Sequence, residues 1–137
     1  MPTPNPLSLR KIVKYVLIIL TILILIYCLS YAIRLGRYKQ AAANLVINEA
    51  DLSSIEDGTY IGSCDIDFVA ATVEVTVSNH MITNINLVNH HTDKGKAAEA
   101  IIPKIVDAQS LQIDAVSGAT NSSKVIKKAI ENALTTN

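Results

Sequence analysis

The sequence predicts an α+β protein in which one N-terminal transmembrane helix precedes a small domain with an antiparallel β-hairpin or sheet packed by helices. Three patterns predict this fold class. They are a long uncharged apolar run near the N-terminus, strict polar–apolar alternation in the middle of the chain, and a helical apolar stripe near the C-terminus. At 137 residues the chain has room for one such domain and an appendage.

The apolar run covers residues 15–33 and reads YVLIILTILILIYCLSYAI, without charge, proline or glycine. About 20 such residues in a helix cross a hydrocarbon core of roughly 30 Å. The run is apolar on every face, which argues against a buried core helix. It is longer than the roughly 7–15 apolar residues of a signal peptide, and no small-x-small cleavage site follows it. We therefore expect a retained membrane anchor.

The rest of the chain divides around this anchor. We expect a cytoplasmic segment at residues 1–14, a stalk or linker at 34–57 and the folded domain at 58–137. Three basic residues precede the anchor and three follow it, so the positive-inside rule leaves the orientation open.

Charge and cysteine content exclude several function classes. From residue 44 onward, 6 lysines stand against 12 aspartates and glutamates, a net charge of −6. With no tryptophan and a single phenylalanine, this acidic domain lacks the basic footprint and stacking surfaces of a nucleic-acid binder. Cys28 falls in the predicted span and Cys64 in the domain, so neither a disulfide nor a metal site is expected from them.

The middle of the chain predicts strands. Thr72–Val77 alternates polar and apolar residues with β-branched side chains dominating, which is typical of a half-buried strand. A short strand is expected at Thr59–Gly62, and Ser78–His80 can turn the chain. The predicted return strand is Met81–Asn89, with Met81, Ile85 and Leu87 on one face.

The C-terminal half predicts helices. Lys96–Ile101 is alanine-rich, and Pro103 suits the first turn of a second short helix that reaches Ala108. The clearest helix is Ser123–Leu134, whose apolar stripe is complete. Its opposite, polar face is predicted to carry Lys124, Lys127, Lys128 and Glu131.

Immediately before that helix lies the small-residue segment DAVSGATNSS, residues 114–123. Ser122 or Ser123 can cap the helix, and Gly118 lets the backbone approach a ligand closely. The free N–H groups and the positive end of the helix dipole suit a phosphate. From the residues alone, a phosphate site and an ordinary capped turn remain equally open.

Other motifs are absent or weak. Residues 118–124 depart from a P-loop, because Ser123 stands for the second glycine and Val125 for the required serine or threonine. The chain has no G-x-S-x-G elbow, and the Asn121 sequon is short enough to arise by chance. His90 and His91 would point to opposite faces of a strand, so they are not expected to share a metal.

The region Gly58–Leu134 resembles the FMN-binding domain family, the small peripheral flavin domains of Rnf complexes and of sodium-translocating NADH:quinone oxidoreductases. The matching features are Asp57-Gly58-Thr59-Tyr60 with Gly62, the strand at Thr72–Val77, His90, Ala108-Gln109-Ser110, and above all Asp114-x-x-Ser117-Gly118-Ala119-Thr120-x-Ser122-Ser123.

The resemblance implies that FMN is the cofactor and that Thr120 carries it through a phosphoester. A flavin transferase would attach it from FAD outside the cytoplasmic membrane, which places the N-terminus inside. The implied transferase recognition residues are Asp114, Ser117, Gly118, Ala119 and Thr120. The implied cofactor contacts are Ser117, Gly118, Ala119, Ser122, Ser123 and His90. Relatives usually carry Glu-Thr where this chain has Thr92-Asp93, so the loop near the flavin ring is expected to differ.

We therefore expect a single-pass, extracytoplasmic flavoprotein that relays electrons between redox partners that the sequence does not identify. The alternative is a non-redox anchored module that binds FMN or another phosphorylated ligand reversibly. A pilin-like subunit ranks last, because the chain lacks a basic leader ending in glycine and an early glutamate in the apolar run. No residue set resembles a substrate-converting site, so enzymatic activity stays open.

Overall fold

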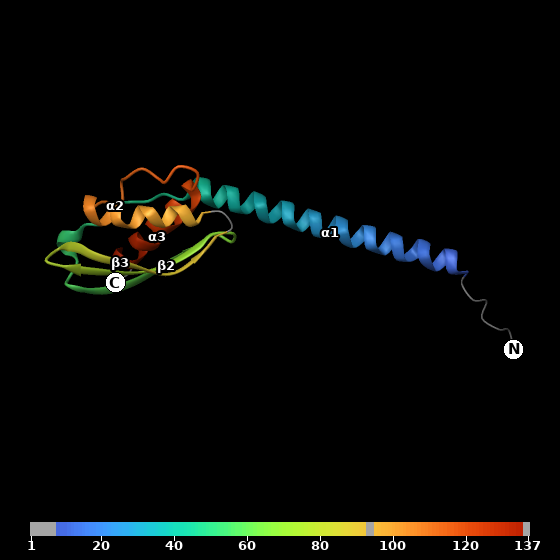
Figure 1. Ribbon diagram of the computed structural model, residues 1–137, viewed down its shortest axis with the longest axis horizontal. Coiled ribbons are helices and arrows are strands. Elements are labelled where there is room, and N and C mark those ends of the chain that lie inside the picture. Colours follow the sequence, from blue (N-terminus) through green and yellow to red (C-terminus); the bar gives the residue numbers. More distant parts are fainter. Residues whose placement is uncertain (1–7, 93–94, 136–137) are drawn as a thin grey trace. The chain divides into compact units, whose positions relative to one another are not determined.

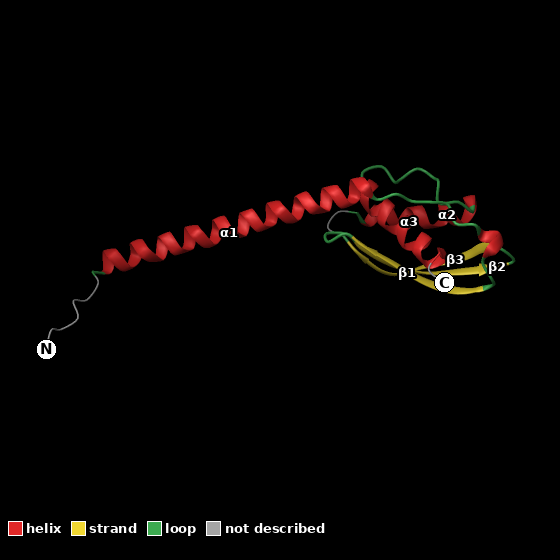
Figure 2. Cartoon of the chain, turned by 180° about the vertical axis from the view of Figure 1, so that it is seen from behind, coloured by secondary structure: helices red, strands yellow, loops and turns green. Residues whose placement is uncertain are grey.

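The computed structural model describes residues 8–92 and 95–135. It confirms the α+β class: a long apolar helix is followed by a three-stranded antiparallel sheet packed with helices (Figures 1 and 2). In chain order the elements are α1 (Leu9–Asn44), the 3-10 helix η1 (Leu52–Ser54), β1 (Gly58–Asp65), β2 (Ala70–Ser78), β3 (Met81–His91), the 3-10 helix η2 (Lys96–Ala100), α2 (Ile101–Ala108) and α3 (Thr120–Thr135).

The chain forms two compact units, residues 1–37 and residues 38–137. The first contains most of α1, which is long and apolar enough to cross a membrane. By length and composition alone, such an N-terminal helix is compatible with a membrane span or with a signal sequence. Of the predicted cytoplasmic segment, residues 1–7 lie outside the described part of the chain.

In the second unit the strands pair in the order β1-β2-β3. The predicted alternation is confirmed in β2, where Val73, Val75 and Val77 are fully or almost fully buried and the residues between them are half-buried. All three strands run past their predicted ends, and β1 is twice the expected length.

The predicted face of β3 is partly wrong. Met81 is 53% exposed, and its neighbour Ile82 takes the buried position opposite Val77. Two irregularities in the register to β2, between Thr72 and Val73 and between Thr76 and Val77, cause this difference. Each bulge adds one residue to β3, so the simple period of two no longer holds along that strand.

Helix α3 lies against β1 and β2. The approach is close at Gly62, where an added Cβ would lie 2.2 Å from the carbonyl oxygen of Ala129 and 2.3 Å from the nitrogen of Ala133. Only a residue without a side chain fits there. The predicted apolar stripe of α3 is confirmed as buried.

Two residues of the predicted polar face of α3, Lys127 and Glu131, are also buried, at 8% and 5% exposure. The segment that follows α1 covers this side: Leu45 and Ile47 pack against the core, as do Leu52 and Ile55 further along. Residues 38–57, for which the sequence predicts a stalk or linker, thus lie within the compact unit.

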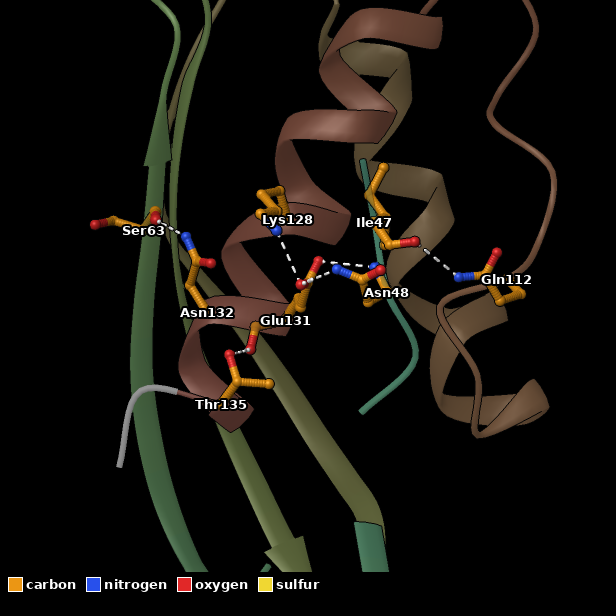
Figure 3. Close-up of polar contacts among 8 residues, drawn as sticks. All are labelled: Ile47, Asn48, Ser63, Gln112, Lys128, Glu131, Asn132 and Thr135. Carbon is orange, nitrogen blue, oxygen red and sulfur yellow. Dashed lines mark hydrogen bonds and ion pairs between the residues drawn. The ribbon is translucent and has the colours of Figure 1, made fainter. Parts of the chain in front are cut away.

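Glu131 attaches this covering segment to α3 (Figure 3). Its carboxylate accepts hydrogen bonds from the Asn48 backbone N–H at 3.0 Å and side-chain amide at 3.1 Å, and from Lys128 Nζ at 2.8 Å. Burial opposes ionisation of Glu131, but these bonds and the Lys128 charge outweigh burial and hold its pKa below the usual value. The ionised carboxylate is therefore the form that the fold requires.

We expect Glu131→Gln to destabilise the full chain in detergent at neutral pH by roughly 1–3 kcal/mol, because the charge-assisted bonds are lost. A carboxyl group with a lowered folded pKa stabilises the fold above its unfolded pKa and loses that contribution as the pH falls through the folded pKa. Stability of the natural chain should therefore fall as the pH drops below about 4.5. The glutamine variant should show a smaller fall. Denaturant unfolding at neutral and acid pH measures both effects.

The matched control is Glu56→Gln, an exposed carboxylate for which the same change should leave stability within about 0.5 kcal/mol. Equal stability of the two variants at neutral pH would contradict the role given to Glu131.

Candidate functional site

The segment that joins α2 to α3 is held against the domain along its length. Its start is bound to Glu49, whose carboxylate accepts from the Ser110 hydroxyl at 2.8 Å and from the Leu111 N–H at 3.0 Å. Further on, the Gln112 side chain donates to the Ile47 carbonyl at 3.0 Å (Figure 3). The backbone of the predicted motif is therefore fixed before it reaches Asp114.

Ser123, within the first turn of α3, forms hydrogen bonds to the segment that precedes the helix. Its hydroxyl donates to the Ala119 carbonyl at 2.9 Å and accepts from the Val116 N–H at 3.0 Å. The Ala119 N–H also donates to the Val116 carbonyl, which makes a tight turn over residues 116–119. Ser123 is fully buried, and both Ser122 and Ser123 lie inside the first turn of α3, so the prediction that one of them caps the helix is wrong.

Helix α3 begins at Thr120, three residues earlier than predicted, which explains why Ser122 and Ser123 lie inside it. Thr120 is exposed at the first position of the helix, and Ser117 and Gly118 are exposed in the turn before it. Gly118 has φ +78°, a conformation that favours glycine. The first N–H groups of a helix have no partner within it, so the Thr120 hydroxyl lies where an anion is stabilised.

Ser122 contacts the loop that follows the C-terminal end of β3. Its hydroxyl lies 3.3 Å from that of Thr92, which in turn accepts from the Gly95 N–H at 2.7 Å. A Cβ added to Gly95 would lie 1.8 Å from the Ser122 hydroxyl oxygen, so this loop and α3 touch directly. Asp93, the second residue of the departure from the family pattern, lies outside the described residues.

His90 lies on the inner side of β3, whereas His91 is exposed, as the strand pattern predicts. The His90 side chain is only 2% exposed, and its Nδ1 lies 3.1 Å from Glu99 Oε1 in η2. Its Nε2 is buried without a hydrogen-bond partner among the described residues. A contact between His90 and a flavin stays a prediction, and the structure places its ring below the surface.

The ammonium group of Lys127 contacts the backbone immediately before the 114–123 motif. Its Nζ donates to the Ile113 carbonyl at 2.8 Å, one residue before the exposed Asp114. Burial lowers the pKa of Lys127, and nearby Lys124 lowers it further, whereas the Asp114 carboxylate raises it. The lysine therefore fixes the backbone at the start of the motif.

Two aromatic neighbours of the site, Tyr38 and Phe68, are not predicted by any sequence pattern. Asn121 donates from its side chain to the Tyr38 hydroxyl at 3.1 Å, and Tyr38 meets Phe68 edge-on with ring centroids 5.5 Å apart. These residues come from α1, from the β1–β2 connection and from α3, and no pattern along the chain links them. The structure thus brings the predicted Ser117–Ser123 group together with residues distant in sequence.

Comparison with known proteins identifies this region. Residues 70–135, from the start of β2 to the end of α3, match a family model described as FMN-binding domain. An uncharacterized protein of Treponema pallidum (strain Nichols) is 33% identical over 85 residues, which cover 60% of this chain and 24% of that protein. The chain therefore matches only about a quarter of the length of that relative. No solved structure gives a significant match.

We expect Ser123→Ala to destabilise the chain by roughly 1–3 kcal/mol, because the partly buried Val116 N–H would lose its acceptor. Hydrogen exchange of the amides of residues 116–119 should accelerate in the same variant. Ser117→Ala, which alters an exposed hydroxyl in the same turn, should change stability by less than about 0.5 kcal/mol. Unchanged exchange in Ser123→Ala would show that the turn does not depend on this hydroxyl.

Proposed function

The chain belongs to the FMN-binding domain family through residues 70–135, and from this we propose that it is a membrane-anchored, extracytoplasmic flavoprotein with FMN linked covalently to Thr120. The observation that carries the proposal is that Thr120 is exposed at the start of α3. It follows directly after a turn that hydrogen bonds of Ser123 stabilise. The apolar α1 supplies the anchor.

The residues around Thr120 fit the phosphate end of FMN. Free N–H groups and the dipole of the 16-residue α3 stabilise a negative charge at its first turn. Gly118 leaves one side open, since nothing lies within 4 Å of a Cβ built on it. Ser117 is an exposed hydroxyl donor nearby, whereas Ser122 and Ser123 are buried and act by shaping the helix start.

Attachment needs FAD and a flavin transferase. The Thr120 oxygen forms a bond to the phosphorus of the FMN half of FAD, and the pyrophosphate bond breaks. AMP leaves with the bonding electron pair, and a base on the transferase takes the hydroxyl proton. No electron is transferred in this step. The preformed turn at Ser117–Ala119 and the exposed Asp114 are the surface that the transferase would recognise.

When bound, FMN would supply the redox chemistry of an electron relay between a reduced membrane redox protein and an oxidised extracytoplasmic acceptor. The chain itself supplies the tether, the phosphate site and the surroundings of the ring. Reversible FMN binding by a non-redox module is the alternative, and the same helix N-terminus supports it. The two functions differ in whether the flavin survives denaturation.

We expect the natural chain, co-expressed with a flavin transferase, to keep one FMN after denaturation, and Thr120→Ala to lose it completely while remaining folded. Thr120 is exposed, so its loss should cost little stability. Thr120→Ser keeps a hydroxyl at the same place and is the matched control, which should remain flavinylated. Intact mass and in-gel flavin fluorescence measure the outcome. FMN released on denaturation of the natural chain would favour the reversible alternative.

We also expect the N-terminus inside and the domain outside the cytoplasmic membrane, because attachment in this family takes place outside. Protease added to intact spheroplasts should digest the region after Lys39 and leave the anchor. Protection of that region until detergent is added would contradict this orientation.

A further inference from the structure

Aromatic side chains are scarce in the unit that follows the anchor. Beyond residue 37 the chain has only Tyr38, Tyr60 and Phe68. Two of these three, Tyr38 and Phe68, meet edge-on with centroids 5.5 Å apart and an interplanar angle of 83°. Both rings are half-buried, so each keeps part of its surface accessible. An edge-on pair offers a ring face and a ring edge, the two contacts that a third aromatic ring prefers.

This pair is attached to the first turn of α3. The Tyr38 hydroxyl accepts from the side chain of Asn121, the residue after Thr120, at 3.1 Å. Lys124, which shares a helix face with Thr120, donates from Nζ to the Ala42 carbonyl at 3.3 Å, one turn of α1 beyond Tyr38. Two contacts therefore hold this part of α1 against the helix start that carries Thr120.

Phe68 is held by a tight connection between β1 and β2. The Phe68 N–H donates to the Ile66 carbonyl, and the Ile66 N–H donates to the Val69 carbonyl at 2.9 Å. Asp67 adopts φ +76°, and its N–H donates to Asp65 Oδ1. The backbone at Phe68 is thus fixed by the hydrogen bonds of this connection.

We propose that Tyr38 and Phe68 form the surface on which the isoalloxazine ring of the Thr120-linked FMN rests. This inference depends on the proposed attachment at Thr120. A phosphate and a ribityl chain separate the attachment oxygen from the ring, so the ring must lie beyond Thr120 itself. The neighbouring aromatic pair offers a ring face and a ring edge, both partly accessible, which are the contacts that a flavin ring makes with aromatic side chains.

Both aromatic residues lie outside the region that matches the family, which begins at residue 70. The Lys124 ammonium adds a positive charge on the Thr120 face, which favours the phosphodiester over a neutral group. The C-terminal end of α1, which contains Tyr38, would then contribute directly to the surroundings of the flavin.

The test uses the full chain in detergent, co-expressed with a flavin transferase, with all signals expressed per covalently bound flavin. A tyrosine ring in contact with a flavin quenches its fluorescence. We expect Tyr38→Leu to raise the flavin fluorescence severalfold and to lower its anisotropy, because the ring gains freedom. Phe68→Leu should lower the anisotropy independently. Tyr38→Phe should raise the fluorescence but keep the anisotropy, since the ring surface remains.

Tyr60→Leu is the matched control, because Tyr60 donates its hydroxyl to the Glu56 carbonyl in the entry turn to β1 and should leave both signals unchanged. If Tyr38→Leu and Phe68→Leu both carry as much flavin as the unmodified chain and show the same fluorescence and anisotropy, the aromatic contact with the flavin ring is contradicted. The attachment at Thr120 would still stand. Absence of covalent flavin from the natural chain would instead overturn the attachment, and the inference with it.

Discussion

The structure depends on a buried polar stripe along α3. Ser123, Lys127 and Glu131 lie four residues apart and so share one helix face. Ser123 and Lys127 bind the segment that joins α2 to α3, and Glu131 binds the segment that follows α1. Ser123 binds the Val116 N–H, Lys127 the Ile113 carbonyl, and Glu131 the Asn48 N–H. Because the sheet covers another side of α3, the helix is enclosed, and the buried polar groups of this stripe are hydrogen-bonded to backbone and side-chain partners within the protein.

This stripe connects the fold to the candidate site. A buried hydroxyl or ammonium that lost its partner would cost free energy, so the covering segments are held in one arrangement. Two of the three bonds end on residues 113 and 116, which precede the exposed Ser117–Thr120 turn. The turn is therefore rigid at its base although its outer surface is accessible. A rigid, accessible acceptor suits recognition by a modifying enzyme, because little ordering entropy is lost on binding.

Sequence patterns predicted the elements whose burial follows a simple period. The alternation of β2 and the apolar stripe of α3 are both found in the structure. The patterns failed where tertiary contacts override the period. Bulges in β3 moved Ile82 rather than Met81 into the core, and burial of Lys127 and Glu131 depends on segments that no local pattern connects to α3. The helix start at Thr120 was missed because Ser122 and Ser123 are typical caps, whereas here they pack inward.

Charge distribution explains why this helix start suits a phosphate in an acidic domain. After residue 44 the chain has 6 lysines and 12 acidic residues. Three of these lysines, Lys124, Lys127 and Lys128, lie in α3. Lys128 is paired with Glu131, whereas the ammonium groups of Lys124 and Lys127 donate to neutral carbonyls within two turns of Thr120. The Asp114 carboxylate offsets part of the charge of Lys127. Together with the helix dipole, these charges make the Thr120 end locally positive although the domain as a whole is negative. The negative charge of the rest of the domain would repel free anions, whereas the phosphate that we propose at Thr120 would be stabilised by this local positive charge.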